Sequence, residues 1–296
     1  MSSFSAQAFE LSVEPVTGNL YALVGEIGPR SPENHALNNT MGFVVTDKGV
    51  VLIGSGASPS GAQLIEKAIR QVTDQPVHTV INIGAQDHHW LGNSYFLAKG
   101  AEILALERTV ASQKQHVDSH LIRLGEIMVR DAEQITPRYA TKAYGSDREK
   151  ITIGGVNFEL IWPGDSHFSG DAILWLPESR AVFAGDLVFH DRMLGIQPFT
   201  PVTSWQQAFH TMAELEPAHV IPGHGHPGNL SKAIRDTGNY LDWLVSEISI
   251  AVDDWKELDE TVELLSEAPD FKHLTFFEGW HKRNINQTFV QIERTR

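Results

Sequence analysis

Four segments of this chain repeat one design, in which an apolar, strand-like run ends in a glycine-containing turn that carries histidine or aspartate. The turns lie at residues 82–89, 163–167, 183–186 and 220–226. In α/β proteins, side chains that follow the carboxyl ends of strands meet at one edge of a sheet, where chemistry is placed. The repetition therefore favours a fold that gathers the four turns around one pocket.

The side chains that the turns would bring together are those of metal-binding proteins. Imidazole nitrogens and carboxylate oxygens are the usual ligands of zinc and similar ions. The candidate metal ligands are His88, His89, His167, Asp186 and His224. We predict that they hold one divalent ion, with zinc as the expected metal and iron or manganese as alternatives. An empty remnant pocket is the competing interpretation.

The order and spacing of the four segments resemble those of the metallo-β-lactamase superfamily. The run at 42–46 and the Pro-Gly-His-Gly turn at 222–225 extend the resemblance over most of the chain. With residues 31–34 and 281–286, the sequence looks closest to the zinc metallohydrolases of the quinoprotein-relay type. The resemblance implies a four-layer αββα sandwich.

The metal-binding loop of that family, His-x-His-x-Asp-His, is degenerate in this chain. Gly84 and Gln86 stand at the two leading histidine positions, His88 stands at the aspartate position, and His89 matches the last histidine. In the family, the leading histidines hold the first metal together with the residue that His167 matches. Because glycine offers no ligand and a neutral amide binds zinc poorly, the first site keeps too few ligands for an ion.

The resemblance leaves the second metal site more complete. His89, His224 and the bridging Asp186 supply three ligands there, and His88 is a candidate fourth. Gly54 replaces an aspartate that usually supports the loop in the family, which predicts weaker orientation of the ligands. We therefore expect an atypical, mononuclear centre.

Several neighbours of the predicted ligands have their own interpretations. Asp87 is a candidate catalytic base, or else the N-cap of a helix that begins near His88. Gln86 and His226 are expected to support the ligands, although His226 could equally lie in solvent. Trp90 is expected to fill or to roof the space that a histidine at position 84 would occupy.

Composition excludes some classes of function. The net charge of −14 opposes binding to nucleic acid and to anionic membranes, and no apolar run is long enough to span a bilayer. The chain has no cysteine, so disulfides and thiolate zinc sites are excluded. The first residues lack the features of a signal peptide. We expect a cytoplasmic protein, or a periplasmic one if an export signal has been removed.

Hydrophobic periodicity predicts a mixed succession of strands and helices. The predicted strands lie near 8–14, 19–25, 41–46, 49–54, 77–82, 102–106, 172–176, 181–185 and 218–222, and Gly154-Gly155 marks a hairpin. The predicted helices cover 60–73, 108–131, 204–215, 230–252, 258–266 and 280–292, besides one after the loop at 82–89. We expect a single domain of residues 1–296, with C-terminal helices from about residue 229. The stretches 116–150 and 190–201 would rim the pocket.

The predicted function follows from the chemistry of the expected ion. A zinc ion with three or four protein ligands and one open position can polarise a carbonyl and lower the pKa of bound water to about 7. We therefore predict a metal-dependent hydrolase of a small ester, thioester or amide-like substrate. The alternative is a catalytically silent relative that binds a ligand or serves as a structural partner. Fold does not fix function, so the sequence selects no particular substrate.

Overall fold

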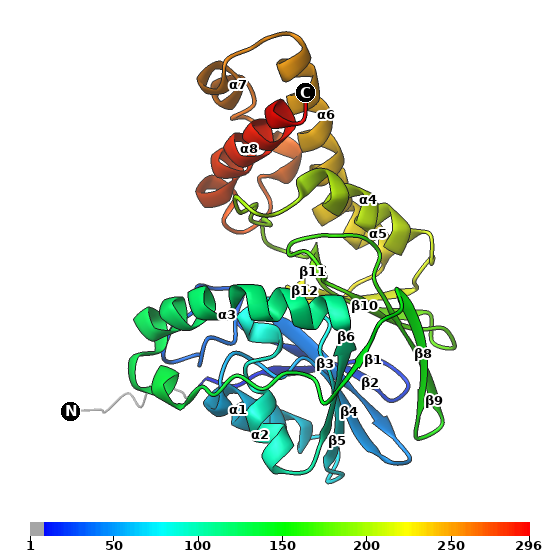
Figure 1. Ribbon diagram of the computed structural model, residues 1–296. Coiled ribbons are helices and arrows are strands. Elements are labelled where there is room, and N and C mark those ends of the chain that lie inside the picture. Colours follow the sequence, from blue (N-terminus) through cyan, green and yellow to red (C-terminus); the bar gives the residue numbers. More distant parts are fainter. Residues whose placement is uncertain (1–8) are drawn as a thin grey trace, which may run out of the picture.

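The structure, a computed structural model, describes residues 9–296. Its strands form two sheets that pack face to face, with helices on both outer faces (Figure 1). This arrangement confirms the αββα sandwich that the sequence predicts. The first residues of the chain, on which the expectation about export rests, lie outside the described range.

The first sheet holds seven strands in sequence order. These strands are β1 (Ser12–Thr17), β2 (Leu20–Val24), β3 (Thr40–Thr46), β4 (Gly49–Ile53), β5 (Val77–Ile81), β6 (Glu102–Leu106) and β7 (Lys142–Tyr144). The pairs from β1 to β4 are antiparallel, and those from β4 to β7 are parallel. Parallel neighbours need crossover connections, which α1 (Pro59–Ile69) and α2 (Asn93–Ala98) help to supply.

The second sheet has the strand order β12-β11-β10-β9-β8. Its strands are β8 (Arg148–Ile153), β9 (Val156–Ile161), β10 (Ile173–Leu176), β11 (Ala181–Phe189) and β12 (His219–His224). Gly154 and Gly155 both have positive φ, as a two-residue hairpin turn requires, and join β8 to β9. The parallel pair β11 and β12 is linked through α4 (Val202–Ala213).

Apolar side chains fill three layers of this sandwich. Val44 and Phe183 belong to the core between the sheets, and Ile65 belongs to the core outside the first sheet. Outside the second sheet, Trp205 and Tyr240 share one core with the C-terminal helices. Those helices begin at α5 (Leu230–Ala233) and continue with α6 (Asn239–Asp253), α7 (Leu258–Leu264) and α8 (Phe277–Arg294). Figure 1 shows α6 to α8 extending away from the sheets.

The structure departs from the predicted elements at two places near the pocket. The stretch 116–150 is not one rim, because only the end of α3 (Glu107–Met128) borders the pocket and the later residues enter β7 and β8. The helix predicted from residue 230 is interrupted by a π-helical turn, Ile234–Gly238. There Thr237 exchanges hydrogen bonds with the backbone of Phe189, which ties the turn to the end of β11.

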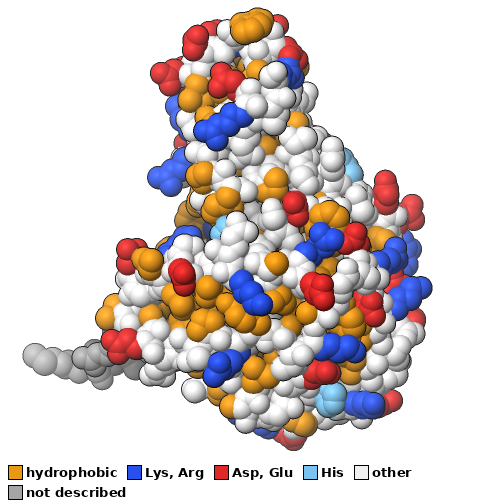
Figure 2. Space-filling model, viewed as in Figure 1, with side chains coloured by type: hydrophobic (Ala, Val, Ile, Leu, Met, Phe, Trp, Pro, Cys, Tyr) orange, Lys and Arg blue, Asp and Glu red, His pale blue; other side chains and the backbone are white. Residues whose placement is uncertain are grey.

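No helix within residues 9–296 is both long and apolar enough to cross a membrane. On the face shown in Figure 2, acidic and basic side chains are interspersed. That face therefore offers no extended basic surface to nucleic acid.

Candidate metal centre

The four turns meet above the ends of neighbouring strands. The loop that carries His89 follows β5, the turn that carries His167 follows β9, and His224 is the last residue of β12. Asp186 differs from the prediction in lying within β11 rather than after it. The fold therefore brings the predicted ligands together from both sheets.

Asp186 is the centre of this group. Its Oδ2 lies 3.2 Å from Nε2 of His88 and 3.2 Å from Nε2 of His89, and its Oδ1 lies 3.6 Å from Nε2 of His224. All four side chains are buried. Burial disfavours the charged carboxylate and would raise the pKa of Asp186. The attraction and hydrogen bonds of His89 and His88 outweigh burial and hold that pKa well below its usual range. Burial likewise disfavours a charge on His89, but the attraction of the Asp186 carboxylate outweighs burial and raises the pKa of that histidine.

Among the described residues, His88, His89 and Asp186 place their possible ligand atoms within 4.8 Å of one another, and His224 approaches the same carboxylate at 3.6 Å. Nε2 of His89 and Oδ1 of Asp186 are buried, and neither has a hydrogen-bond partner among residues 9–296. Nδ1 of His224 donates to the backbone oxygen of Asn38 at 2.8 Å, which leaves Nε2 free as a ligand, the arrangement usual in metal-binding histidines. Ligand atoms around a tetrahedral zinc lie about 3.3 Å apart, close to the separations found here.

His88 is placed differently from the other two histidines. Its Nδ1 lies 2.6 Å from a guanidinium nitrogen of Arg30. A guanidinium can only donate, so Nδ1 accepts and the ring proton lies on Nε2, which donates to Asp186. Burial lowers the pKa of His88 to about 3, so the ring is neutral at pH 7. The prediction that His88 is a fourth ligand stays a prediction, and its hydrogen bonds favour a supporting role.

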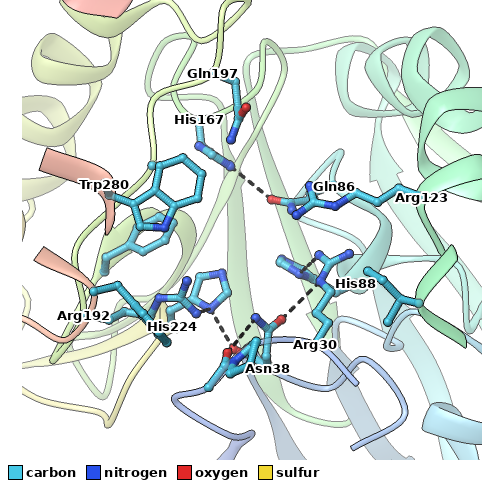
Figure 3. Close-up of a pocket in the computed structure, with 16 residues that line it drawn as sticks. Arg30, Asn38, Gln86, His88, Arg123, His167, Arg192, Gln197, His224 and Trp280 are labelled. Carbon is cyan, nitrogen blue, oxygen red and sulfur yellow. Dashed lines mark hydrogen bonds between the residues drawn. The ribbon is translucent and has the colours of Figure 1, made fainter. Parts of the chain in front are cut away.

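Gln86 lies between His167 and Asp186. Its amide lies 3.1 Å from Nε2 of His167 (Figure 3). With the amide oxygen facing Arg30 at 3.0 Å, the nitrogen donates to both His167 and Oδ2 of Asp186, at 3.1 and 3.0 Å. This orientation satisfies both ends of the amide. The uncharged amide thus joins His167 to Asp186, and the supporting role of Gln86 stays a prediction.

The space next to Gly84 is taken by His89 and not by Trp90. A Cβ atom at position 84 would lie 2.3 Å from Cδ2 of His89 and 2.9 Å from its Nε2. Trp90 lies elsewhere, stacked on Tyr139 with its Nε1 donating to the backbone oxygen of Ala85. The expectation that Trp90 fills this space was therefore wrong. The glycine that removes one ligand makes room for the ring of another.

We expect Gly84→Ala to displace the ring of His89. Overpacking of this kind costs about 1–3 kcal/mol of unfolding free energy. Misplacing a ligand should also weaken metal binding, by roughly the 10- to 100-fold seen when supporting groups are lost. Chemical denaturation and calorimetric zinc titration measure the two effects. The matched control is Gly125→Ala in α3, where no heavy atom lies within 4 Å of the added Cβ. Equal behaviour of the two variants would contradict the packing argument.

Asp87 forms a buried ion pair with Arg30, a residue that the sequence patterns did not single out. The guanidinium nitrogens lie 2.6 Å from each carboxylate oxygen, in a bidentate contact. Burial opposes the charge on Asp87, but Arg30 outweighs it and lowers the pKa of the carboxyl. Asp87 is not the N-cap of the short helix η1 (Asp87–His89), because Gln86 holds the cap position and makes no side-chain cap bond.

The backbone of the metal-binding loop is held by buried amides. Asn82 donates to the carbonyl of His89 at 3.2 Å and accepts from Asn93 at 2.7 Å. Ser55 donates its hydroxyl to Asn93 and its backbone N–H to the carbonyl of His89. Gly54 has positive φ, which glycine adopts without strain. This network gives the loop a support that does not depend on the aspartate missing at position 54.

Asp171 is the third buried carboxyl near the site, after Asp186 and Asp87, and the sequence patterns did not single it out. It accepts hydrogen bonds from the backbone N–H groups of Ala85 and Phe168, so it joins the first loop to the turn that carries His167. Burial, together with the charge of Asp186, raises the pKa of Asp171 to about 7. His226 lies apart from this cluster, because its side chain is exposed and pairs with Glu14 at 2.8 Å.

A cavity of about 330 Å³ opens beside the centre (Figure 3). His88, His167 and His224 line it, so a molecule in the cavity would lie against the candidate ligands. Arg30, Arg123 and Arg192 also line it, with Trp280 on the side of the C-terminal helices. The stretch 190–201 supplies Arg192, Gly195 and Gln197, as its predicted place at the rim requires.

Comparison with solved structures assigns the fold. The chain superposes on a metallo-β-lactamase from Pontibacter korlensis with a TM-score of 0.59 and 19% identity, covering 79% of this chain and 99% of that one. A double mutant of the sec-alkyl sulfatase PisA1 gives a TM-score of 0.72 at 17% identity, over 95% of this chain and 50% of the sulfatase. The protein thus has the metallo-β-lactamase fold.

Two curated relatives are also similar in sequence. The 2,4-dinitroanisole O-demethylase subunit alpha of Nocardioides sp. (strain JS1661) is 28% identical over 179 residues, 60% of this chain and 50% of the subunit. The Beta-lactamase-like protein 2 homolog of Caenorhabditis elegans is 27% identical over 118 residues, 39% of this chain and 36% of that protein. The chain therefore spans half or less of the curated relatives it matches. No family model matches the chain.

Proposed function

We propose that this protein is a metal-dependent hydrolase whose single ion is held by His89, Asp186 and His224. The observation that carries the proposal is a pair of buried atoms that make no hydrogen bond within residues 9–296, Nε2 of His89 and Oδ1 of Asp186, in one cluster with the oriented ring of His224. An ion bound there would supply Lewis-acid activation of a carbonyl group and of water. We propose zinc, because histidines and a carboxylate form one of its catalytic ligand sets.

The neighbouring side chains have supporting roles in this proposal. His88 and Gln86 donate hydrogen bonds to Asp186 and so fix the plane of its carboxylate. Burial lowers the pKa of His167 to about 4, so that ring faces the cavity as a neutral group at pH 7. Asp87 is engaged by Arg30, and we assign it to holding the loop rather than to acting as a base.

The substrate is proposed only as a class. By their names, the similar proteins act on 2,4-dinitroanisole or on a secondary alkyl sulfate, or are β-lactamases. These activities share the cleavage of a small organic molecule and differ in the bond, since one fold hosts many chemistries. We therefore propose a small ester, thioester or amide-like substrate that enters the 330 Å³ cavity.

We expect the protein, purified without chelator, to contain about one equivalent of a divalent metal per chain. One site has three fitting ligands, and Gln86 closes the other. Elemental analysis measures the content, and hydrolysis of p-nitrophenyl acetate before and after chelation measures turnover. Two equivalents, or none after reconstitution with zinc, iron and manganese, would contradict the single-ion centre. Retained metal without turnover of any ester, thioester or amide would favour the silent, ligand-binding alternative.

A further inference from the structure

Two arginines at the cavity wall have no anionic partner in the described part of the chain. Arg30 is matched by Asp87, but Arg123 and Arg192 form no ion pair among residues 9–296. No carboxylate lines the cavity. This is unexpected in a chain with a net charge of −14, where carboxylates outnumber basic side chains. Asp186 attracts Arg192 and Asp87 attracts Arg123, but neither arginine forms an ion pair with them, so positive charge is concentrated at the cavity wall.

Arg192 has hydrogen-bond donors that the protein leaves unused. Its Nε is buried and finds no acceptor among the described residues. Its NH1 lies 3.4 Å from Nδ1 of His224, but that nitrogen already donates to Asn38, so the contact joins two donors. Burial lowers the pKa of Arg192 to about 10, and the group stays charged at pH 7. Buried donors without acceptors are rare in proteins and call for a ligand.

The backbone holds Arg192 in position before any ligand binds. Residue 192 forms a β-bridge with Thr275, flanked by hydrogen bonds from Met193 to Thr275 and from Thr275 to Asp191. The guanidinium lies 5.1 Å from the ring of Phe276. A positively charged group fixed in this way loses little conformational entropy when it binds an anion.

Arg192 and Arg123 face one cavity from opposite sides. Figure 3 shows Arg192 beside His224 and Trp280, and Arg123 beside Gln86 across the cavity. They come from different elements, since Arg123 lies on α3 and Arg192 follows β11. An oxyanion between them would lie next to the candidate ligand His224, and an apolar body could lie against Trp280 and Phe276.

We propose that the cavity binds a small organic molecule that carries an oxyanion, a carboxylate or a sulfate ester, between Arg192 and Arg123. The planar guanidinium matches such groups with two parallel hydrogen bonds. This inference deepens the proposed function by naming the charge of its substrate. The anion positions the molecule so that its neighbouring bond lies beside His89, Asp186 and His224.

Calorimetric titration with phenylacetate, phenyl sulfate and the neutral phenylacetamide tests the proposal. We expect both anions to bind and the amide to bind much more weakly. Arg192→Gln and Arg123→Gln should each weaken anion binding by roughly 10- to 100-fold, the range for hydrogen bonds to charged groups. Arg192→Lys keeps the positive charge but lacks the planar guanidinium with its two parallel donors. Its affinity for the anions should therefore fall less than that of Arg192→Gln. The control is Arg70→Gln, which changes an exposed arginine that pairs with Glu66. This variant should bind both anions as the parent protein does.

The titrations are made on protein as purified and again after chelation, with metal content measured on both samples. Anion binding that survives chelation and depends on the two arginines supports the proposal even where no metal is retained. Equal binding of phenylacetate and phenylacetamide, or unchanged anion binding by both glutamine variants, overturns it even where the metal centre is intact. If phenyl sulfate binds more tightly than phenylacetate, the substrate class is a sulfate ester, and the reverse order assigns a carboxylate.

Discussion

Asp186→Ala and His224→Ala should each abolish metal retention by the purified protein. Asp186 is the group that all three neighbouring histidines approach within 3.6 Å, and its removal takes away the carboxylate that those rings share. His224 is the histidine whose second nitrogen is held by a carbonyl, as ligands usually are. A site reduced from three protein ligands to two falls short of what zinc sites use. Elemental analysis after dialysis, with circular dichroism to check folding, measures the outcome.

Two control variants distinguish ligands from neighbours in the same cluster. His226→Ala should retain metal like the parent, because its side chain is exposed and pairs with Glu14. His88→Ala should keep the ion with an affinity lowered by about 10- to 100-fold, as expected for a residue that orients Asp186. Complete loss in His88→Ala would show that His88 is itself a ligand. Normal retention in both the Asp186 and His224 variants would show that the centre lies elsewhere.

Most strands and helices were predictable because local patterns specify them, whereas the αββα layering was implied by the resemblance to the metallo-β-lactamase superfamily. Alternating and continuous apolar runs predict the strands. Gly154-Gly155 predicts a hairpin, because glycine adopts the two positive φ angles of the turn without strain. The π-helical turn at Ile234–Gly238 could not be predicted in this way. It depends on a hydrogen bond between Thr237 and Phe189, which are 48 positions apart. Hydrophobic periodicity gives no information about such a contact.

The site was predictable where its residues belong to the repeated turns. Each predicted ligand follows an apolar run and a glycine, which places the four histidines at or beyond a strand end, whereas Asp186 lies within β11. Arg30, Asn38 and Arg192 lie in irregular segments, and their roles depend on contacts with distant residues. Arg30 meets Asp87 across 57 positions.

The packing at Gly84 shows why substitution patterns alone mislead about a pocket. From the sequence, a glycine in place of histidine leaves a space, and the nearest large side chain, Trp90, was expected to fill it. In the structure the ring of His89 lies over Gly84. A ring can turn toward a neighbour that lacks a Cβ, and such a rotation depends on the whole surrounding core. Restoring histidine at position 84 would therefore compete with His89 for space.

Arg30→Ala should lower the free energy of unfolding by about 3–5 kcal/mol, the usual cost of removing one partner from a buried ion pair. The variant leaves the Asp87 carboxylate buried without the bidentate contact that compensates its charge. It also removes the donor that fixes the ring of His88. Urea unfolding followed by circular dichroism measures the change, on protein freed of metal so that ion binding does not shift the result.

Two control variants complete the test of Arg30, one that removes both charges of the buried pair and one that disrupts an exposed ion pair. In Arg30→Met with Asp87→Asn the buried charge is gone from both sides, so most of the lost stability should return. Lys67→Ala disrupts an exposed pair with Glu10 and should change the free energy of unfolding by no more than about 1 kcal/mol. If Arg30→Ala costs as little as Lys67→Ala, the pair with Asp87 does not hold the loop. The orientation of His88 and His89 would then rest on the buried amides Asn82 and Asn93 alone.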